Sequence, residues 1–111
     1  MSTCDRRQRI AELNDKFRRT FVGGMVVKSA AIAALPADVQ ATIMQKVMTF
    51  TEFCADNDPH GEHDFGSFRL AGHHVFWKID NYDERMEWGS EDPADPRKTK
   101  RVLTVMLAEE Y

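Results

Sequence analysis

Carboxylate and imidazole side chains crowd into one short stretch of this chain. Residues 56–66 read Asp-Asn-Asp-Pro-His-Gly-Glu-His-Asp-Phe-Gly, which places four carboxylates and two imidazoles within eleven residues. Oxygen and nitrogen donors of these kinds are the usual ligands of divalent metal ions. The candidate ligands are Asp56, Asp58, His60, Glu62, His63 and Asp64. A metal ion held here would activate a bound water, so one hypothesis from the stretch is a small metal-dependent hydrolase.

An architectural role for the same stretch is the alternative. A calcium-binding loop that began at Asp56 would need a bidentate glutamate at its twelfth position, where this chain has Ser67. The separation between His60 and His63 matches no established zinc motif. Aspartates in turns commonly accept hydrogen bonds from the backbone N–H groups of the turn itself. The sequence therefore assigns no cofactor with certainty, and a divalent metal ion is the one candidate.

A second group of carboxylates lies closer to the C-terminus. Residues 80–95 contain seven acidic residues and one arginine, whereas residues 1–28 carry seven Lys or Arg against three Asp or Glu. A surface of one sign attracts partners of the opposite sign over about 8 Å at physiological salt. The acidic segment predicts a binding surface for another protein, formed by Asp83, Glu84, Glu87, Trp88, Glu91 and Asp92. The alternative is that the basic and acidic segments neutralise one another within the fold.

Nucleic acid is the less favoured partner. A net charge of −3 and a pI of 5.8 argue against a dedicated nucleic-acid-binding protein, although basic residues at 6–19 and 97–101 could form one patch. No apolar run suits a signal peptide, and none approaches the length that spans a bilayer. The two cysteines give no disulfide framework. We therefore expect a cytoplasmic protein without a membrane partner, and its oligomeric state stays open.

The spacing of apolar residues predicts the elements that position these side chains. Apolar residues three or four apart indicate amphipathic helices, and the two segments that flank Ala71-Gly72 indicate a hairpin with a two-residue loop. Asp95 before Pro96 is typical of a helix start. Residues 25–34 stay open between strand and helix. The predicted elements are a helix over residues 5–19, a short strand over 25–29, a helix over 36–53, hairpin strands over 65–70 and 73–79, a third strand over 85–88, and a closing helix from Asp95.

The hairpin register makes a sharper prediction. A loop at Ala71-Gly72 pairs Phe68 with Val75 and Gly66 with Trp77, and it places His63 opposite Asp80. Successive side chains of a strand point to opposite faces of the sheet. The face expected in the core carries Phe68, Leu70, Val75, Trp77 and Ile79. The other face carries Phe65, Arg69, His74, Phe76 and Lys78.

Together these elements predict an α+β fold in a single domain over residues 1–111, with residues 1–4 frayed. A small antiparallel sheet packs against three helices, as a three-stranded meander with a fourth short strand if residues 25–29 are extended. The third strand is expected to bury Met86 and Trp88. The residues of the closing helix expected to face inward are Val102, Leu103, Met106 and Leu107.

Motifs along the chain resemble one family. They are Leu13-Asn14-Asp15 with Phe17-Arg18, Gly23-Gly24, Leu35-Pro36, Asp56 through Gly66, Phe76 through Asp80, Gly89 through Pro93, and Val102-Leu103-Thr104 with Glu110-Tyr111. Over nearly the whole chain they resemble a family of small alphaproteobacterial proteins of chromosomes and plasmids, domain of unknown function 3768. The resemblance implies no assigned enzyme, cofactor or partner. It implies that the acidic turn, the Trp77 strand and the Gly89–Pro93 loop belong to the recurring pattern, from which Asn81 departs because an aromatic residue is expected there.

Two functions of different classes follow from these patterns. The first is a non-catalytic protein-binding or regulatory module that acts through its acidic face, and the implied plasmid carriage suggests a host defence or DNA-processing complex as its target. The second is the metal-dependent hydrolase centred on residues 56–64. We favour the first because no complete nucleophile, phosphate-loop or zinc signature accompanies the carboxylates. Charge reversal at Glu84, Glu87 and Glu91 separates them, since it would release the partner of a module and leave a hydrolase active.

Overall fold

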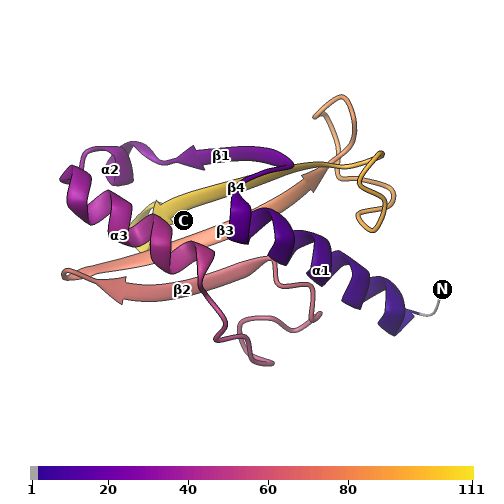
Figure 1. Ribbon diagram of the computed structural model, residues 1–111, viewed down its shortest axis with the longest axis horizontal. Coiled ribbons are helices and arrows are strands. Elements are labelled where there is room, and N and C mark those ends of the chain that lie inside the picture. Colours follow the sequence, from indigo (N-terminus) through magenta and orange to yellow (C-terminus); the bar gives the residue numbers. More distant parts are fainter. Residues whose placement is uncertain (1–2) are drawn as a thin grey trace.

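Four strands form one mixed sheet in this protein. The computed structural model describes residues 3–111, with side chains from residue 5 onward. The predicted fraying of residues 1–4 falls largely outside them, and the first helix begins at Thr3. The elements are α1 (Thr3–Thr20), β1 (Gly24–Lys28), α2 (Ala30–Ala33), α3 (Ala37–Met48), β2 (Phe65–Leu70), β3 (His73–Tyr82), β4 (Lys100–Leu107) and the 3-10 turn η1 (Ala108–Glu110) (Figure 1). The strand order is β1-β4-β3-β2, in which β1 and β4 are parallel and the other neighbours antiparallel.

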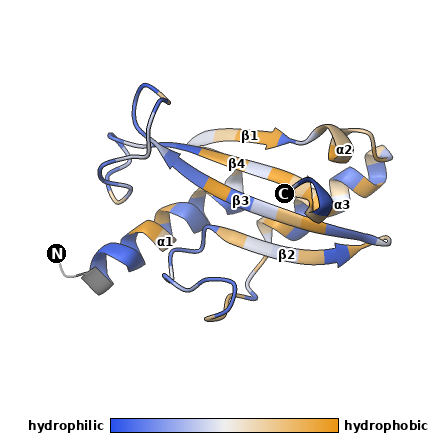
Figure 2. Cartoon of the chain, turned by 180° about the vertical axis from the view of Figure 1, so that it is seen from behind, coloured by the Kyte–Doolittle hydropathy of each residue, from blue (hydrophilic) through white to orange (hydrophobic). Residues whose placement is uncertain are grey.

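The fold is α+β, as predicted, with the helices on one face of the sheet. α1, α2 and α3 cover that face, whereas the view from behind shows the strands in front with η1 beside the C-terminus (Figures 1 and 2). Trp77, Val75 and Leu103 of the sheet are fully buried against Ile43 and Val47 of α3. Among residues 3–111, no helix is long and apolar enough to cross a membrane.

The hairpin prediction is confirmed in its register. Phe68 pairs with Val75 and Gly66 with Trp77, across the turn at Ala71-Gly72. Ala71 and Gly72 adopt positive φ of 52° and 81°, which the two-residue hairpin turn requires. The alternation therefore assigned the buried face of β3 correctly, since Val75, Trp77 and Ile79 are 0%, 0% and 4% exposed.

The open question at residues 25–34 resolves into a strand followed by a helical turn. β1 runs parallel to β4, which no hairpin or local pattern could indicate. Ser29 then caps α2, because its hydroxyl accepts a hydrogen bond from the Ile32 N–H at 3.2 Å. The fourth strand of the prediction is therefore present.

The predicted closing helix is wrong, because residues 100–107 form the strand β4. Asp95 does not cap a helix; its carboxylate accepts a hydrogen bond from the Arg97 N–H at 2.9 Å and closes a turn. β4 lies between β1 and β3 and is buried from both faces, so it needs a nearly continuous apolar run. Such a run is ambiguous between helix and strand. The four residues expected to face inward are all buried, but on alternating faces of a strand: Val102, Leu103, Met106 and Leu107.

The predicted third strand is also wrong. Residues 85–88 form a loop, in which Met86 has a positive φ of 61° and only Gly89 bridges back to Tyr82. Met86 and Trp88 are 41% and 74% exposed rather than buried. Asp83 redirects the chain, because its carboxylate accepts the Glu87 N–H at 3.0 Å and so favours a tight turn.

The second helix is shorter than predicted. α3 ends at Met48, although Phe50 and Phe53 beyond it still pack on the core. The apolar stripe therefore continued past the last helical turn. The predicted opposition of His63 and Asp80 lies beyond the β2 ladder, which begins at Phe65, although the Ile79 N–H still donates to the carbonyl of Asp64 at 2.8 Å.

Candidate functional site

The acidic turn folds around the carboxylate of Asp58. This side chain accepts hydrogen bonds from the backbone N–H of Glu62 at 3.1 Å and of His63 at 3.2 Å. The Asp58 N–H in turn donates to the carbonyl of Cys54 at 2.8 Å. Asp58 is 8% exposed, so its charge is used inside the turn. This is the architectural role that the sequence left open for the turn.

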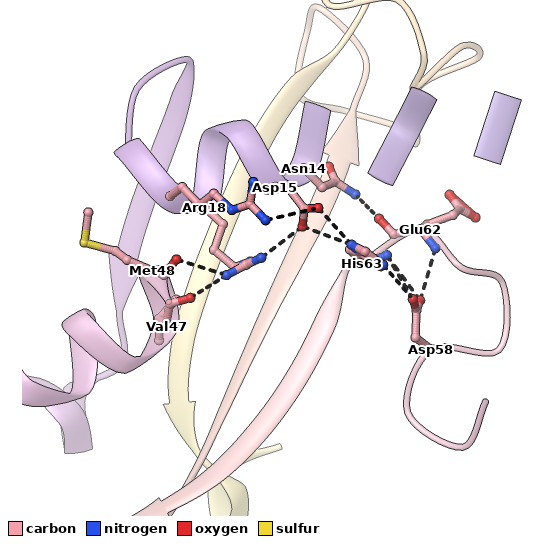
Figure 3. Close-up of polar contacts among 9 residues, drawn as sticks. Asn14, Asp15, Arg18, Val47, Met48, Asp58, Glu62 and His63 are labelled. Atoms are coloured by element: carbon pink, nitrogen blue, oxygen red, sulfur yellow. Dashed lines mark hydrogen bonds and ion pairs between the residues drawn. The ribbon is translucent and has the colours of Figure 1, made fainter. Parts of the chain in front are cut away.

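His63 ties the turn to α1. Its Nδ1 lies 3.0 and 2.9 Å from the two carboxylate oxygens of Asp15 (Figure 3). A positive φ of 54° turns the residue out of the line of β2. Its ring stacks on Phe53, with parallel planes and centroids 3.9 Å apart. The imidazole is thus held on three sides, because its Nε2 also lies 3.7 Å from Asp58.

Arg18 is the buried charge on which this arrangement converges. Its guanidinium donates to Asp15 Oδ1 at 2.9 Å and to the carbonyl of Val47 at 2.8 Å, at the C-terminal end of α3 (Figure 3). The last carbonyls of a helix lack partners within it and carry partial negative charge, so they favour a cation. The guanidinium also lies over the rings of Trp77 and Phe53, 5.1 and 5.5 Å from their centroids. Burial lowers the pKa of Arg18, against the opposing effect of Asp15.

Asn14 connects α1 with two further segments. Its Nδ2 donates to the carbonyl of Glu62 at 2.9 Å, and its Oδ1 accepts from Arg101 Nε at 2.9 Å. Arg101 also donates to the carbonyl of Pro93. Asn14 is fully buried. One face of α1 therefore fastens the acidic turn, β4 and the loop after residue 92 to one another.

The six predicted metal ligands do not converge on one point. Asp58 and His63 meet, as described, but Asp56 and His60 are exposed. Among residues 3–111, no group of three or more His, Cys, Asp or Glu side chains is placed to hold a metal ion. Metal binding at these residues stays a prediction. The partners that His63 finds outside the turn, Asp15 and Phe53, were not among the predicted site residues.

Burial raises the pKa of two carboxylates in the turn. Desolvation is the main cause at both Glu62 and Asp64, and the negative charges of neighbouring carboxylates act in the same direction. Hydrogen bonding opposes the shift at Asp64. The folded protein therefore binds these protons more tightly than the unfolded chain does, so both groups weaken folding once they are ionised.

An Asp64→Asn variant should be more stable than the wild type at neutral pH. Because the pKa of Asp64 is raised in the fold, its stabilising effect is full below the ordinary aspartate pKa, about 4, and is lost as pH rises through the raised value. The amide carries no charge, so the advantage of the variant should vanish in acid. Urea unfolding of both proteins at a series of pH values measures this difference. A variant that is equally destabilised at every pH would contradict the desolvation argument.

The acidic loop, which connects β3 to β4, forms a cleft. A hollow of about 510 Å³ is lined by Asp83, Glu84, Arg85, Trp88, Gly89, Glu91 and Lys98. Four of the six predicted binding residues line this cleft: Asp83, Glu84, Trp88 and Glu91. The other two predicted residues do not line the cleft. Glu87 is exposed in the same loop, and Asp92 Oδ1 lies 3.5 Å from Nη2 of Arg6 in α1.

Hydrogen bonds hold the acidic loop in shape. The Asp83 N–H donates to the carbonyl of Trp88 at 2.8 Å, and the Ser90 N–H donates to the carbonyl of Asn81 at 2.8 Å. The Ser90 hydroxyl lies 2.8 Å from that of Thr99, which is 7% exposed. Trp88 is therefore presented to solvent by a loop with defined internal bonds.

Comparison with known proteins identifies a matching family. Residues 28–110 match a family described as protein of unknown function, DUF3768. No curated protein and no solved structure matches the chain. The match covers the acidic turn, the hairpin, the acidic loop and β4.

Proposed function

The chain belongs to the DUF3768 family, whose description assigns no function, and we propose that it is a non-catalytic module that binds a basic segment of another protein. The proposed binding site is the acidic cleft formed by the loop that connects β3 to β4. The observation that carries the proposal is Trp88, a large apolar side chain 74% exposed in a cleft lined by carboxylates. Exposed tryptophans on well-defined surfaces are frequent anchors of protein interfaces.

The chemistry of the cleft suits a cationic side chain. An indole face attracts a cation through its ring quadrupole, and arginine is the more frequent partner. Asp83, Glu84 and Glu91 supply carboxylates on the same cleft, against Arg85 and Lys98. Carboxylate pairs with arginine are frequently bidentate and charge-assisted. A basic segment of a DNA-processing or defence protein is the kind of partner that offers such side chains.

The bonding of the loop supports binding further. A surface that is ordered before binding loses less conformational entropy when the partner arrives. The hydrogen bonds of Asp83, Ser90 and Thr99 provide that order. The opposite case is the acidic turn, where Asp58 already accepts backbone N–H groups of the turn and His63 already contacts Asp15 of α1. Glu84 and Glu91 of the cleft are therefore the better candidates for an intermolecular role, whereas Asp83 already accepts the Glu87 N–H within its loop.

A Trp88→Ala variant should bind a basic peptide about tenfold more weakly than the wild type does, because it loses the stacking surface of the cleft. Fluorescence anisotropy with a fluorescein-labelled oligo-arginine peptide measures the dissociation constant. Tyr111→Ala is the matched control, since Tyr111 is another aromatic residue with nearly equal exposure, 76% against 74%, and it lies outside the cleft. Equal affinity of the Trp88→Ala variant and the wild type would remove the cleft as the binding site.

A further inference from the structure

The sheet face opposite the helices is not covered by an α-helix in the part of the chain that the structure describes. Figure 2 looks onto this face, where the strands lie in front of α1 and α3. Val75 and Trp77 of β3 are fully buried toward the helices, so Phe76 between them points to the other side. Phe65 of β2 shares that side, because it pairs with Lys78. We call this surface, which carries Phe65 and Phe76, the outer sheet face.

Three aromatic rings meet on the outer sheet face. The ring centroid of Phe76 lies 5.1 Å from that of Phe65 and 5.6 Å from that of Tyr111. The centroids of Phe65 and Tyr111 are 6.1 Å apart. Tyr111 is 76% exposed, and the two phenylalanines are only partly buried. Aromatic rings that are gathered and open to solvent form a platform on which flat ligands can stack.

The turn η1 fixes the most exposed of these rings. Glu110 Oε1 accepts hydrogen bonds from the Ser29 hydroxyl at 2.6 Å and from the Leu107 N–H at 2.8 Å. The Tyr111 N–H donates to the carbonyl of Ala108 at 3.2 Å. Tyr111 is therefore ordered before a ligand arrives, which lowers the entropic cost of binding.

Two cations flank the rings. Arg69 of β2 lies opposite His74, and Lys100 of β4 lies opposite Tyr82. His74 and Tyr82 lie on the same side of β3 as Phe76, so the two cations are separated by about 26 Å along the strand, with the rings between them. Both cations are exposed, and neither side chain makes a hydrogen bond or ion pair with another residue among 5–111.

Two carboxylates near this surface are engaged within the protein. Asp80 is bound to Lys78, whose Nζ lies 2.9 Å from Asp80 Oδ2. Glu110 accepts the two hydrogen bonds described above. Glu109 differs, since it lines a hollow of about 270 Å³ together with Arg69 and the hairpin turn. The outer sheet face therefore presents aromatic rings between two available cations.

We propose that the outer sheet face binds single-stranded RNA. The bases stack on the three rings, and the phosphates bind Arg69 and Lys100. Stacking on aromatic side chains accepts any base, because every base has a flat π-face, and cations hold the charged backbone. An acidic protein segment fits less well, since it would meet the two cations and leave the three rings without flat partners.

Two hydroxyl groups favour RNA over DNA. Ser67 pairs with Phe76 and Thr104 with Lys78, so both hydroxyls lie on the outer sheet face. Neither hydroxyl has a hydrogen-bond partner among residues 5–111. The ribose 2′-OH both donates and accepts, so it can bond to such groups, whereas deoxyribose lacks this hydroxyl.

Fluorescence anisotropy with a labelled oligouridine of about eight nucleotides tests the platform. Tyr111→Ala should weaken binding about tenfold, because one base loses the ring on which it stacks. Tyr111→Phe keeps the ring and should bind like the wild type. Trp88→Ala is the matched control, since Trp88 is 74% exposed and lies in the acidic cleft. A wild type that does not bind RNA, or a Tyr111→Ala variant that binds it like the wild type, overturns the inference.

The salt dependence of the affinity tests the two cations. The slope of log affinity against log salt concentration reports phosphate contacts, at about 0.7 per contact for a single strand. Arg69→Gln combined with Lys100→Gln should therefore flatten the slope by about 1.4. Lys16→Gln combined with Arg19→Gln removes the same charge from exposed positions of α1 and should leave the slope unchanged. Equal slopes in the two double variants overturn the phosphate contacts.

The choice of ligand is tested by oligodeoxyuridine and by an oligo-glutamate peptide in the same assay. RNA should bind about fivefold more tightly than DNA with the same bases, the gain expected from one hydrogen bond, and the peptide should not compete. DNA that binds as tightly as RNA overturns the assignment to RNA, and a peptide that displaces RNA overturns stacking as the basis of binding. The inference goes beyond the proposed function and fails separately from it, because oligo-arginine binding depends on Trp88 and RNA binding on Tyr111.

Discussion

An Arg18→Ala variant should lose about 3–5 kcal/mol of its free energy of unfolding, the cost expected when one member of a buried, hydrogen-bonded charge pair is removed. The Arg18 side chain is fully buried and satisfies both Asp15 and the last carbonyls of α3. Without it, those groups stay buried with fewer partners, and a cavity opens beside Trp77 and Phe53. Such a loss is a large fraction of the stability of a small domain.

Urea unfolding followed by circular dichroism measures the loss. Arg19→Ala is the matched control, because the Arg19 side chain is 59% exposed and its Nη2 lies as far as 4.0 Å from Asp15 Oδ2. Its loss should change the free energy of unfolding by less than about 0.5 kcal/mol. Arg18→Met keeps most of the buried volume and removes the charge, so it separates the cavity from the lost polar contacts. An Arg18→Ala protein as stable as the Arg19→Ala protein would contradict the central place given to this side chain.

A Gly66→Ala variant should destabilise the protein by about 1–3 kcal/mol through overpacking. A Cβ atom at this position would contact Trp77 Nε1 and would lie 2.6 Å from Trp77 Cε2 and 2.8 Å from Phe50 Cε1. Trp77 is fully buried beneath the helices, so neither ring has free space into which to move. The added methyl group should therefore shift the tryptophan from its position.

Thermal unfolding and the near-ultraviolet circular dichroism of Trp77 measure the effect of this methyl group. Gly89→Ala is the control, because a Cβ atom there meets nothing within 4 Å. The expected result is a lower melting temperature and an altered aromatic spectrum for Gly66→Ala alone. If both variants melt together with the wild type, the packing of Gly66 against Trp77 is not as tight as described.

Local patterns predicted the hairpin and failed at β4, for a physical reason. At residues 65–79 the alternation and the Ala71-Gly72 turn act over a few residues, and the register followed from them. At residues 100–107 the partners are β1 and β3, which lie far away in the sequence. An apolar run buried on both faces has no alternation to read, and the Asp95-Pro96 pair imitated a helix start. Tertiary pairing decided the structure there.

The candidate sites show the same difference between local patterns, which were predicted, and contacts distant in the sequence, which were missed. The acidic loop was found from composition, because charges that are close in the sequence stay close in one loop. The contacts of the acidic turn with Asp15 and Asn14 were missed, because 48 residues separate each pair. One signal was available: Asn14 and Arg18 interrupt the buried face of α1 four residues apart, and both are fully buried. Polar residues on an apolar face indicate partners elsewhere in the chain.

The most direct test of the proposed binding cleft is a matched pair of triple charge reversals. The first protein carries Glu84→Lys, Glu87→Lys and Glu91→Lys, at and beside the cleft. The second carries Glu12→Lys, Glu52→Lys and Glu109→Lys, which are also exposed and lie outside the cleft. Both proteins carry three reversals, so their net charge is the same. Anisotropy with the labelled oligo-arginine peptide should show binding weakened at least about tenfold in the first protein and far less in the second. Equal weakening in both would mean that net charge alone attracts the peptide, and would contradict a specific binding cleft.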